Sequence, residues 1–569
     1  MTVHAATMAT SAQVRPAQNW ILSPVQDSLF IIAAPLLALG LALLSFNWLG
    51  AAAATAAILV THVVFTVAHH LPTFIRVYGD VDLFRRYRWS FVLAPVVPLV
   101  FALGTLAWIN AHDLPLETFL YLYIMLALWD PWHFLRQHYG FMRIYDRHNA
   151  APRKLAARMD LGLSASWFVF IMLASGEWLA GMLEDLNGRV QVPLAMALPL
   201  GLLSGLTILA RDIATCATAG YLVYLFVCWR RGWFVSLPKL ALAGITFIVM
   251  YLAYAPNAWM ASVAPEWSFK VGFAAIGIVH MTQYLAIVWR YNRGLARSDP
   301  RARAGWFRGV HARGGALLAA VYVLVCLAYG SGLTQVHDNR WLMSVLLALG
   351  FTSTLLHYYF DGFIWKVRHA QNRENLGLTP QGFDQRSDQG SALSWWAKAR
   401  VPGPAAVLTR QLLYFGIPMG LLTAGMLSAS AAPTNYIQHM YAAEDSSRHG
   451  EYSRAASEAG LAFTAMRRQL PFAGRIAQLQ PTAAREAAYA FLLYNQSYYA
   501  NVVMPALAGE APLAWQRRAH REAVGQAIAV LETAMTRGGS LAHAGRDSLS
   551  IDDVRRTLAS WRRVVNQPL

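Results

Sequence analysis

The chain has 569 residues, of which 56% are hydrophobic and only 14% are charged, whereas about a quarter of the residues in a soluble globular domain are charged. This composition excludes an ordinary water-soluble globule and indicates a protein embedded in a lipid bilayer. The net charge of +17 does not require a nucleic-acid partner, because the cytoplasmic loops of membrane proteins are themselves rich in Lys and Arg.

The N-terminal 27 residues are polar and lack a signal-peptide cleavage pattern, so residues 1–27 are expected to form a short cytoplasmic arm. Residues 28–430 hold apolar runs of the length that a membrane-spanning helix requires, about 20 residues. These runs are 28–46, 50–70, 89–110, 116–136, 161–182, 212–229, 238–256, 271–290, 315–333, 341–365 and 406–430. The sequence therefore predicts a transmembrane domain with about eleven spans.

A further apolar stretch, 192–209, is rich in Pro, Gly and Leu, and the charge pattern decides whether it crosses the membrane. Five Arg-rich connections are expected on the cytoplasmic side, where Lys and Arg concentrate. They are 76–88, 136–158, 230–231, 290–313 and 366–400. All five share one side if 192–209 does not cross. The N-terminus is then cytoplasmic, and the C-terminal segment lies on the far side, the periplasm if the protein belongs to a bacterial inner membrane.

Residues 431–569 contain no further spanning run and are expected to form a soluble helical domain. The turn at Gly450, followed by Ala455 and Ala462, is similar to the turn between the two helices of a tetratricopeptide repeat, where small residues let the helices approach closely. The predicted fold class is all-α: a polytopic transmembrane helix bundle followed by a small soluble, tetratricopeptide-like domain. Such a domain either binds a protein partner or only caps the bundle, and the sequence leaves both open.

Seven histidines fall on four of the predicted spans, and the orientation derived from Arg alone places all seven toward the cytoplasmic ends. They are His62, His69, His70, His133, His138, His280 and His357. Ionisable side chains at membrane depth are costly, and those that occur are usually functional or paired. A single buried histidine is more often a satisfied core residue, but seven at one depth indicate a metal site.

The spacing of the histidines indicates which of them can face one centre. His62 and His69 share one face of a helix, and His70 lies on the adjoining stripe. His133 and His138 are five residues apart, which turns them about 140° away from each other in a regular helix. We therefore expect a distortion at Pro131. Asp130, one turn before His133, is expected to be a ligand or to orient the His133 imidazole.

Two further pairs have the spacing of ligands on one helix face: His280 with Gln283, and His357 with Asp361. Imidazole and carboxylate ligands without thiolate suit iron, zinc, copper or manganese. Seven histidines exceed the needs of one ion. Two first-row ions with about four protein ligands each account for them most economically, with Asp361 as the expected carboxylate and Gln283 as a possible additional ligand.

On these residues the chain resembles the integral-membrane histidine-box superfamily of desaturases, hydroxylases and alkane monooxygenases. His133-x4-His138 is similar to the first box of that superfamily, His69-His70 to half of a later box, and His280-x2-Gln283 to boxes in which Gln replaces His. The order of the boxes differs and no HxxHH string is present. The resemblance implies a non-haem di-iron site that uses O2 to hydroxylate, desaturate or otherwise oxidise a hydrophobic or amphipathic substrate.

The resemblance also implies an electron donor on the cytoplasmic side, and the Arg-rich loops could attract an acidic ferredoxin or rubredoxin. Among the groups at the depth of the histidines, Asp130 and Tyr358 are the candidate catalytic residues. Two alternatives stay open. Paired histidines on separate spans also bind haem in b-type membrane cytochromes, and a metal transporter or a membrane acyltransferase could use some of the same residues.

Overall fold

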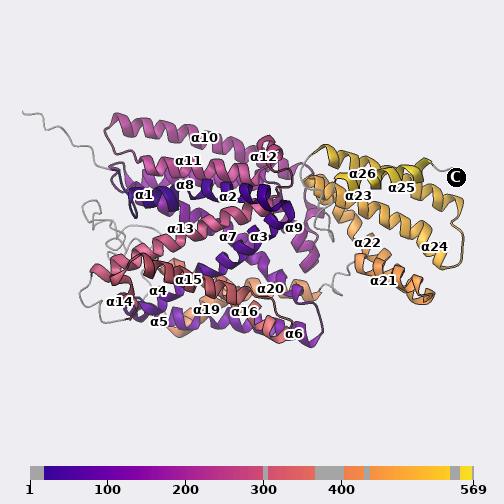
Figure 1. Cartoon of the computed structure of the whole chain (residues 1–569), viewed down its shortest axis with the longest axis horizontal. Helices are drawn as coiled ribbons and strands as arrows, with labels where there is room; N and C mark the ends of the chain where they lie inside the picture. The colour runs from indigo at the N-terminus through magenta and orange to yellow at the C-terminus, as the bar shows by residue number, and fades with distance from the viewer. Residues whose placement is uncertain (1–17, 299–305, 365–402, 429–435, 538–550, 567–569) are drawn as a thin grey trace, which may run out of the picture.

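The structure is a computed structural model that describes residues 18–298, 306–364, 403–428, 436–537 and 551–566. Every regular element in these ranges is a helix, which confirms the predicted all-helical class. The helices form a large bundle, and the C-terminal helices form a separate stack at one end of it (Figure 1).

Nine helices or helix pairs of the described residues are long and apolar enough to cross a membrane, and a tenth is possible if a bent pair counts as one span. The nine are α3 (Ala51–Ala68) with α4 (His70–Gly79), α5 (Val81–Leu93) with α6 (Val96–Ala111), α8 (Arg153–Ala174), α10 (Leu202–Arg230), α11 (Leu237–Tyr254), α13 (Phe269–Ser298), α15 (Ala316–Thr334), α16 (Arg340–Ile364), and α19 (Pro404–Gln411) with α20 (Ile417–Ser428). The bent pair joins Pro24–Ile32 (α1 and η1) to α2 (Ala34–Leu49) at an angle of 53°. These helices agree with a membrane protein.

Two predicted segments differ from their expected form. The run 116–136 divides into the 3-10 helix η2 (Leu116–Leu122) and the first part of α7 (Tyr123–Tyr145). Helix α7 packs against α8, α11 and α16, yet it is not among the spans, because its Asp, Arg and His side chains lower its hydropathy. The stretch 192–209 forms no spanning helix of its own: it holds the short 3-10 helix η3 (Leu194–Ala197), and its end belongs to α10.

The chain runs back and forth so that the Arg-rich connections of the described residues gather at one end of the bundle. Helices α5 and α14 (Trp306–Arg313) mark this end, at the left of Figure 1, and the C-terminal stack lies at the opposite end. Arg136 belongs to helix α7 and not to the connection that follows it. The predicted connection 366–400 lies outside the described residues.

Helix α13 is the most enclosed of the spans. In its apolar 18-residue segment 72% is buried inside the bundle, against 56% in the next most enclosed span, α11. Gly277 of this helix receives the imidazole of His62, since a Cβ at Gly277 would lie 2.3 Å from His62 Cε1. Helix α13 therefore places His280 at the centre of the bundle, where a polar side chain has no access to bulk water.

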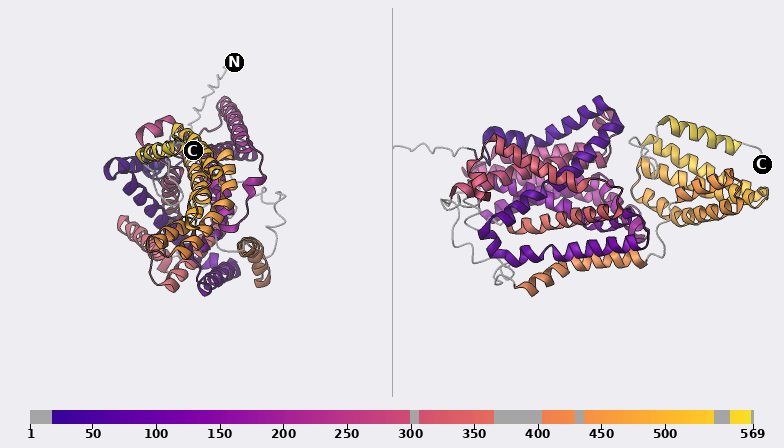
Figure 2. Two further views of the ribbon diagram at one scale, coloured as in Figure 1. Left: turned by 90° about the vertical axis from the view of Figure 1, so that its right-hand side faces the viewer. Right: turned by 60° about the horizontal axis from the view of Figure 1, so that its bottom comes forward.

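In its described residues, 436–537 and 551–566, the C-terminal stack has six α-helices and one short π-helix; Figure 2 shows how they pack side by side. They are α21 (Tyr436–Arg448), α22 (Tyr452–Leu479), α23 (Ala483–Tyr498), η8 (Tyr499–Val503), α24 (Met504–Leu507), α25 (Ala514–Thr536) and α26 (Ile551–Asn566). Gly450 makes the predicted turn with a φ of +76°, and Ala455 and Ala462 are buried after it. Helix α22 has 28 residues, too long for a 34-residue unit of two helices, so the likeness to a tetratricopeptide repeat stays a prediction.

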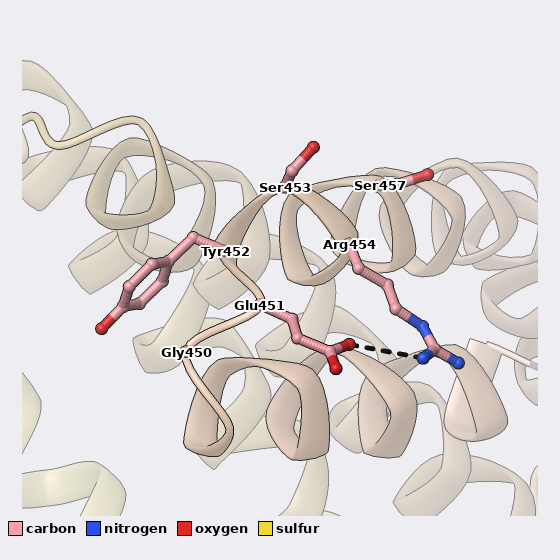
Figure 3. A pocket seen from close by; sticks show the side chains of 6 residues that line it. All are labelled: Gly450, Glu451, Tyr452, Ser453, Arg454 and Ser457. Atoms are coloured by element: carbon pink, nitrogen blue, oxygen red, sulfur yellow. Dashed lines mark hydrogen bonds and ion pairs between the residues drawn. The ribbon is translucent and has the colours of Figure 1, made fainter.

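The turn at Gly450 also borders a surface hollow (Figure 3). Its walls are Gly450, Glu451, Tyr452, Ser453, Arg454 and Ser457. All six residues are exposed, and Glu451 and Arg454 pair at 3.3 Å. The hollow is an open surface feature and encloses no buried polar group.

The C-terminal stack contacts the bundle at α9 (Glu177–Val190). Arg485 of α23 bridges two carboxylates of α9, at 3.1 Å from Glu177 and 2.8 Å from Glu184. Partial burial raises the pKa of Glu177, and the charge of the Arg485 guanidinium opposes that shift. Leu183 of α9 and Leu479 of α22 belong to an apolar cluster beside the ion pairs. This junction attaches the stack to the end of the bundle opposite the Arg-rich connections.

From this arrangement and the side preference of Arg, we expect the two ends of the bundle to face opposite compartments. A cysteine-free variant carrying Ser457→Cys in the C-terminal stack should react with a membrane-impermeant maleimide applied to intact cells. The matched variant Ala150→Cys, in the connection between α7 and α8, should react only after the membrane is permeabilised. Both positions are exposed. Labelling of Ala150→Cys but not Ser457→Cys in intact cells would contradict the predicted orientation.

Candidate metal centre

Four histidines from four different helices converge inside the bundle. His69 follows α3, His133 lies on α7, His280 on α13 and His357 on α16. One ring nitrogen of each lies within 4.8 Å of the corresponding nitrogens of the other three. All four side chains are buried. Among the described residues this is the one group of three or more His, Cys, Asp or Glu side chains that could hold a metal ion.

The distances within the group suit one first-row metal ion. The Nε2 atom of His357 lies 3.1 Å from Nε2 of His69 and 3.2 Å from Nε2 of His133. Two nitrogens bound about 2.0–2.1 Å from one ion are about 3.0 Å apart at a right angle and about 3.4 Å apart at the tetrahedral angle. The three histidines thus have the separation of neighbouring ligands.

Hydrogen bonds on the far side of two rings determine which nitrogen faces the centre. His69 Nδ1 lies 3.3 Å from the carbonyl oxygen of Phe65, which accepts a hydrogen bond and cannot donate one. Nδ1 therefore carries the proton and Nε2 presents a lone pair to the centre, the usual arrangement of a metal-bound histidine. Nδ1 of His357 lies 2.8 Å from Thr73 Oγ1.

Thr73 links His357 to the carboxylate of Asp361. The phenol of Tyr284 donates to Asp361 Oδ1 at 2.6 Å, and Thr73 Oγ1 lies 2.5 Å from that phenol oxygen. Thr73 has one proton, which Tyr284 accepts, so Thr73 in turn accepts the proton of His357 Nδ1. The other carboxylate oxygen, Asp361 Oδ2, is 3.7 Å from His133 Nε2 and 3.9 Å from His357 Nε2. Asp361 is thereby held at the edge of the histidine group.

This hydrogen bonding leaves lone pairs facing each other at the centre. With protons on Nδ1 of His69 and His357, their Nε2 atoms cannot hydrogen-bond across 3.1 Å, and two lone pairs at that distance repel. In addition, within the described part of the chain neither ring nitrogen of His280 has a hydrogen-bond partner, and Nε2 of His70 has none either, although these atoms are buried. Buried polar atoms without partners are costly. A cation between the rings removes both penalties, so these residues fit a bound metal ion.

Asp130 and Tyr358, the predicted catalytic residues, lie beside the group. The Tyr358 phenol donates to Asp130 Oδ1 at 3.0 Å, and the Tyr358 ring packs against the His133 ring with centroids 4.8 Å apart. Asp130 thus reaches His133 only through Tyr358 and holds that tyrosine against the imidazole.

Four predicted ligands, His62, His70, His138 and Gln283, lie outside the four-histidine group. His62 is two turns from His69 and packs against Phe273 with ring centroids 6.0 Å apart. Helix α7 continues through Pro131 without the expected distortion, so His138 faces away from His133 and packs against Phe247 of α11. The Gln283 amide donates to the carbonyl oxygen of Ile31 at 2.8 Å. His70 stacks on His357, with centroids 4.9 Å apart, and lies next to the group.

Besides Tyr284, two polar residues of the site were not among the candidates from sequence. Thr73 supports His357, and Ser353 Oγ lies 3.0 Å from His70 Nδ1. A signal for both was present, because Thr73 follows His69 by four residues and Ser353 precedes His357 by four, so each shares a helix face with a ligand candidate. Thr and Ser are too common in membrane helices for this spacing alone to single them out.

We expect Tyr284→Phe and Thr73→Val each to lower metal affinity about tenfold, the lower end of the range for residues that orient ligands. Both changes keep the side-chain volume and remove only the hydroxyl that links His357 to Asp361. Competition with a chelator of known affinity measures the effect. Tyr121→Phe is the matched control, since its buried hydroxyl bonds to Thr423 without contacting a histidine of the centre. An equal loss of metal affinity in Tyr121→Phe would mean that removing any buried hydroxyl weakens metal binding by loosening the bundle, and would contradict a specific role for Thr73 and Tyr284.

The chain was also compared with protein-family models, with curated proteins and with solved structures. No family model, curated protein or solved structure matches it. The site is therefore interpreted from its own residues.

Proposed function

We propose that this protein is a membrane-embedded, metal-dependent oxidoreductase that acts on a hydrophobic or amphipathic substrate. The observation that carries the proposal is the convergence of His69, His133, His280 and His357 within 4.8 Å, with Asp361 at the edge of the group. Nitrogen and carboxylate ligands without thiolate suit non-haem iron, and the histidine-box resemblance favours the same metal.

The geometry favours bare metal ions over haem. Haem takes its two axial imidazoles on opposite faces of a flat macrocycle. Here the Nε2 atoms of three histidines lie as close as 3.1–3.2 Å, and the rings of His133 and His280 are 5.0 Å apart, which leaves no slot for a macrocycle. The fixed orientation of His69 and His357 also favours a resident ion over one in transit.

We propose two irons, as the number of histidines predicts. The four-histidine group with Asp361 would hold the first. His70, whose buried Nε2 has no hydrogen-bond partner among the described residues, would be a ligand of the second. When bound, the irons would supply O2 activation and the oxidation of an unactivated bond, with electrons from a donor protein.

The chain's own residues orient the ligands, exclude water and leave one side accessible. His69 and His357 are almost fully enclosed, whereas the side chains of His133 and Asp361 keep 10% and 11% of their surface exposed. The substrate is therefore proposed to approach between α7 and α16, where Tyr358 and Asp130 also lie. An acidic electron donor of the ferredoxin or rubredoxin type is proposed to dock at the Arg-rich end of the bundle.

Metal analysis of the purified full-length protein, with an optical spectrum of the same sample, tests the proposal. We expect about two irons per chain, no Soret band, and O2 consumption that depends on a reductant and a hydrophobic substrate. A Soret band would favour the haem alternative. Zinc, or an ion that exchanges freely during purification, would favour a transporter or a hydrolytic enzyme and overturn the oxidoreductase assignment.

A further inference from the structure

Tyr284 of α13 places a buried phenol directly against the candidate metal centre. Its ring centroid lies 5.0 Å from that of His357 and 5.6 Å from that of His69. Its hydroxyl donates to Oδ1 of Asp361 at 2.6 Å, and the residue is 1% exposed. Tyr284 thus packs against two imidazoles of the group and hydrogen-bonds the carboxylate at its edge.

The hydrogen bond to Asp361 suits Tyr284 for one-electron chemistry. A phenol gives up an electron readily only when its proton leaves with the electron, so a base has to lie within hydrogen-bond reach, about 2.6–3.2 Å. Oδ1 of Asp361 meets this condition, and Thr73 Oγ1 also hydrogen-bonds the phenol oxygen, at 2.5 Å. Burial keeps a phenoxyl radical away from molecules in solution that would quench it. The site therefore gives Tyr284 a base, a fixed orientation and enclosure.

A second buried tyrosine follows Tyr284 toward the Arg-rich end of the bundle. Tyr291 comes seven residues later on α13, so the two share one helix face and lie about 10.5 Å apart along the axis. The guanidinium of Arg76 lies 3.8 Å from the centroid of the Tyr291 ring, and both residues are buried. Arg76 pairs with Asp80 at 3.8 Å and also interacts electrostatically with both phenols. The two tyrosines and this arginine thus lead from the centre toward the end where the electron donor is proposed to dock.

Tyr358 is the other tyrosine, among the described residues, whose ring contacts histidines of the group. Its phenol donates to Asp130, which reaches the group only through Tyr358, whereas the acceptor of Tyr284 lies at the edge of the group itself. Tyr358 is also only partly buried, and it lies where the substrate is proposed to approach. Tyr358 is therefore a natural comparison for Tyr284, because both phenols donate to a carboxylate beside the same centre.

We propose that Tyr284 is a redox-active residue that passes single electrons from the Arg-rich end of the bundle to the metal centre. This inference rests on the proposed function and identifies the residue through which the centre is reduced. In the first step, the iron centre that has reacted with O2 takes one electron from Tyr284, the phenol O–H bond breaks, and the proton passes to Asp361. The donor protein then returns one electron to the Tyr284 radical by way of Tyr291, and the proton moves back from Asp361. The net result is one electron transferred from the donor to the centre.

Electron paramagnetic resonance of the iron-loaded, full-length protein tests the inference without substrate turnover. The reduced protein is mixed with O2 in the absence of substrate and donor, and samples are frozen at intervals. We expect the signal of a tyrosyl radical, which should narrow when the protein is produced with ring-deuterated tyrosine. Tyr284→Phe should lose this signal. When reduced methyl viologen is then added, the radical should decay more slowly in Tyr291→Phe than in the unaltered protein.

Two matched variants separate this role from a structural one. Thr73→Val is expected to weaken metal binding as much as Tyr284→Phe does, but it keeps the phenol, so at equal iron content it should still form the radical. Tyr358→Phe removes the comparison tyrosine and should also keep the radical. Loss of the radical in both Thr73→Val and Tyr284→Phe would leave Tyr284 only the role of orienting Asp361 and would overturn the inference.

A radical that persists in Tyr284→Phe, or that is lost in Tyr358→Phe alone, would also overturn the inference, as would the absence of a radical in the unaltered protein. An unchanged decay in Tyr291→Phe would overturn the proposed route. Iron content and O2 consumption are measured on the same samples. A protein that binds iron and consumes O2 without forming the radical would lose only this inference, whereas a protein that binds no iron would lose the proposed function as well.

Discussion

Replacing His357 by alanine is expected to reduce metal affinity by at least about 100-fold and to abolish O2-dependent turnover. His357 is the histidine whose Nε2 lies closest to two others, and the substitution also removes the hydrogen bond that holds Thr73. Loss of a residue that only orients a ligand typically costs about 10-fold to 100-fold, so loss of a ligand should cost no less. Asp361→Ala is expected to fall within the same 10-fold to 100-fold range.

Metal content per folded protein, measured after size-exclusion chromatography, checks this prediction. His138→Ala is the matched control, because it removes another buried histidine, one that packs against Phe247 outside the four-histidine group. The structure predicts full metal content for His138→Ala, whereas a site built from all seven histidines predicts a loss. Full metal content in His357→Ala would remove this histidine from the site and with it the main support for a metal centre.

Replacing Lys239 by methionine is expected to destabilise the bundle by about 3–5 kcal/mol, the range for removing one partner of a buried ion pair. Lys239 of α11 is 1% exposed, and its Nζ lies 2.8 Å from Asp146 and 3.1 Å from Asp160. Arg143 pairs with the same two carboxylates. The two cations and two carboxylates balance, so the substitution leaves one uncompensated negative charge inside the bundle.

Thermal unfolding of the solubilised protein measures this effect, and the double variant Lys239→Met with Asp160→Asn provides the test of its cause. Because the double variant restores the charge balance, it should recover a large part of the stability. Arg189→Ala is the control for a partly exposed pair, with an expected effect of no more than about 1 kcal/mol. Equal destabilisation in the single and double variants would attribute the effect to lost packing.

The helical architecture could be predicted from the sequence because long apolar runs specify spanning helices directly. Candidate ligands could be predicted from the same runs, since a histidine buried in an apolar run costs free energy and is usually functional or paired. His357 and Asp361 are the clearest case: their spacing of four residues fixes a common face in any regular helix, and the structure places His357 in the four-histidine group and Asp361 at its edge.

The final choice among the seven histidines could not be made from sequence, because it depends on how helices turn relative to each other. Pro131 predicted a distortion that would bring His138 around to His133, but α7 is one continuous helix through Pro131. Likewise, the spacing of His280 and Gln283 is correct for two ligands, yet the nearby carbonyl oxygen of Ile31 binds the Gln283 amide. The outcome for Gln283 depends on a tertiary neighbour that is remote in the chain.

The polarity of α7 also bears on the order in which the bundle is assembled during synthesis. A single Asp or Arg at the centre of a helix costs about 2.5–3.5 kcal/mol when the helix enters a bilayer from the translocon, and α7 carries Asp130 and Arg136 as well as Arg143. The lysine that completes the charge balance around Arg143 belongs to α11, which emerges from the ribosome about 100 residues later. We therefore expect α7 to remain at the translocon or the membrane surface until α11 has been made. The metal centre then forms only after α7 has inserted together with the helices that are made later.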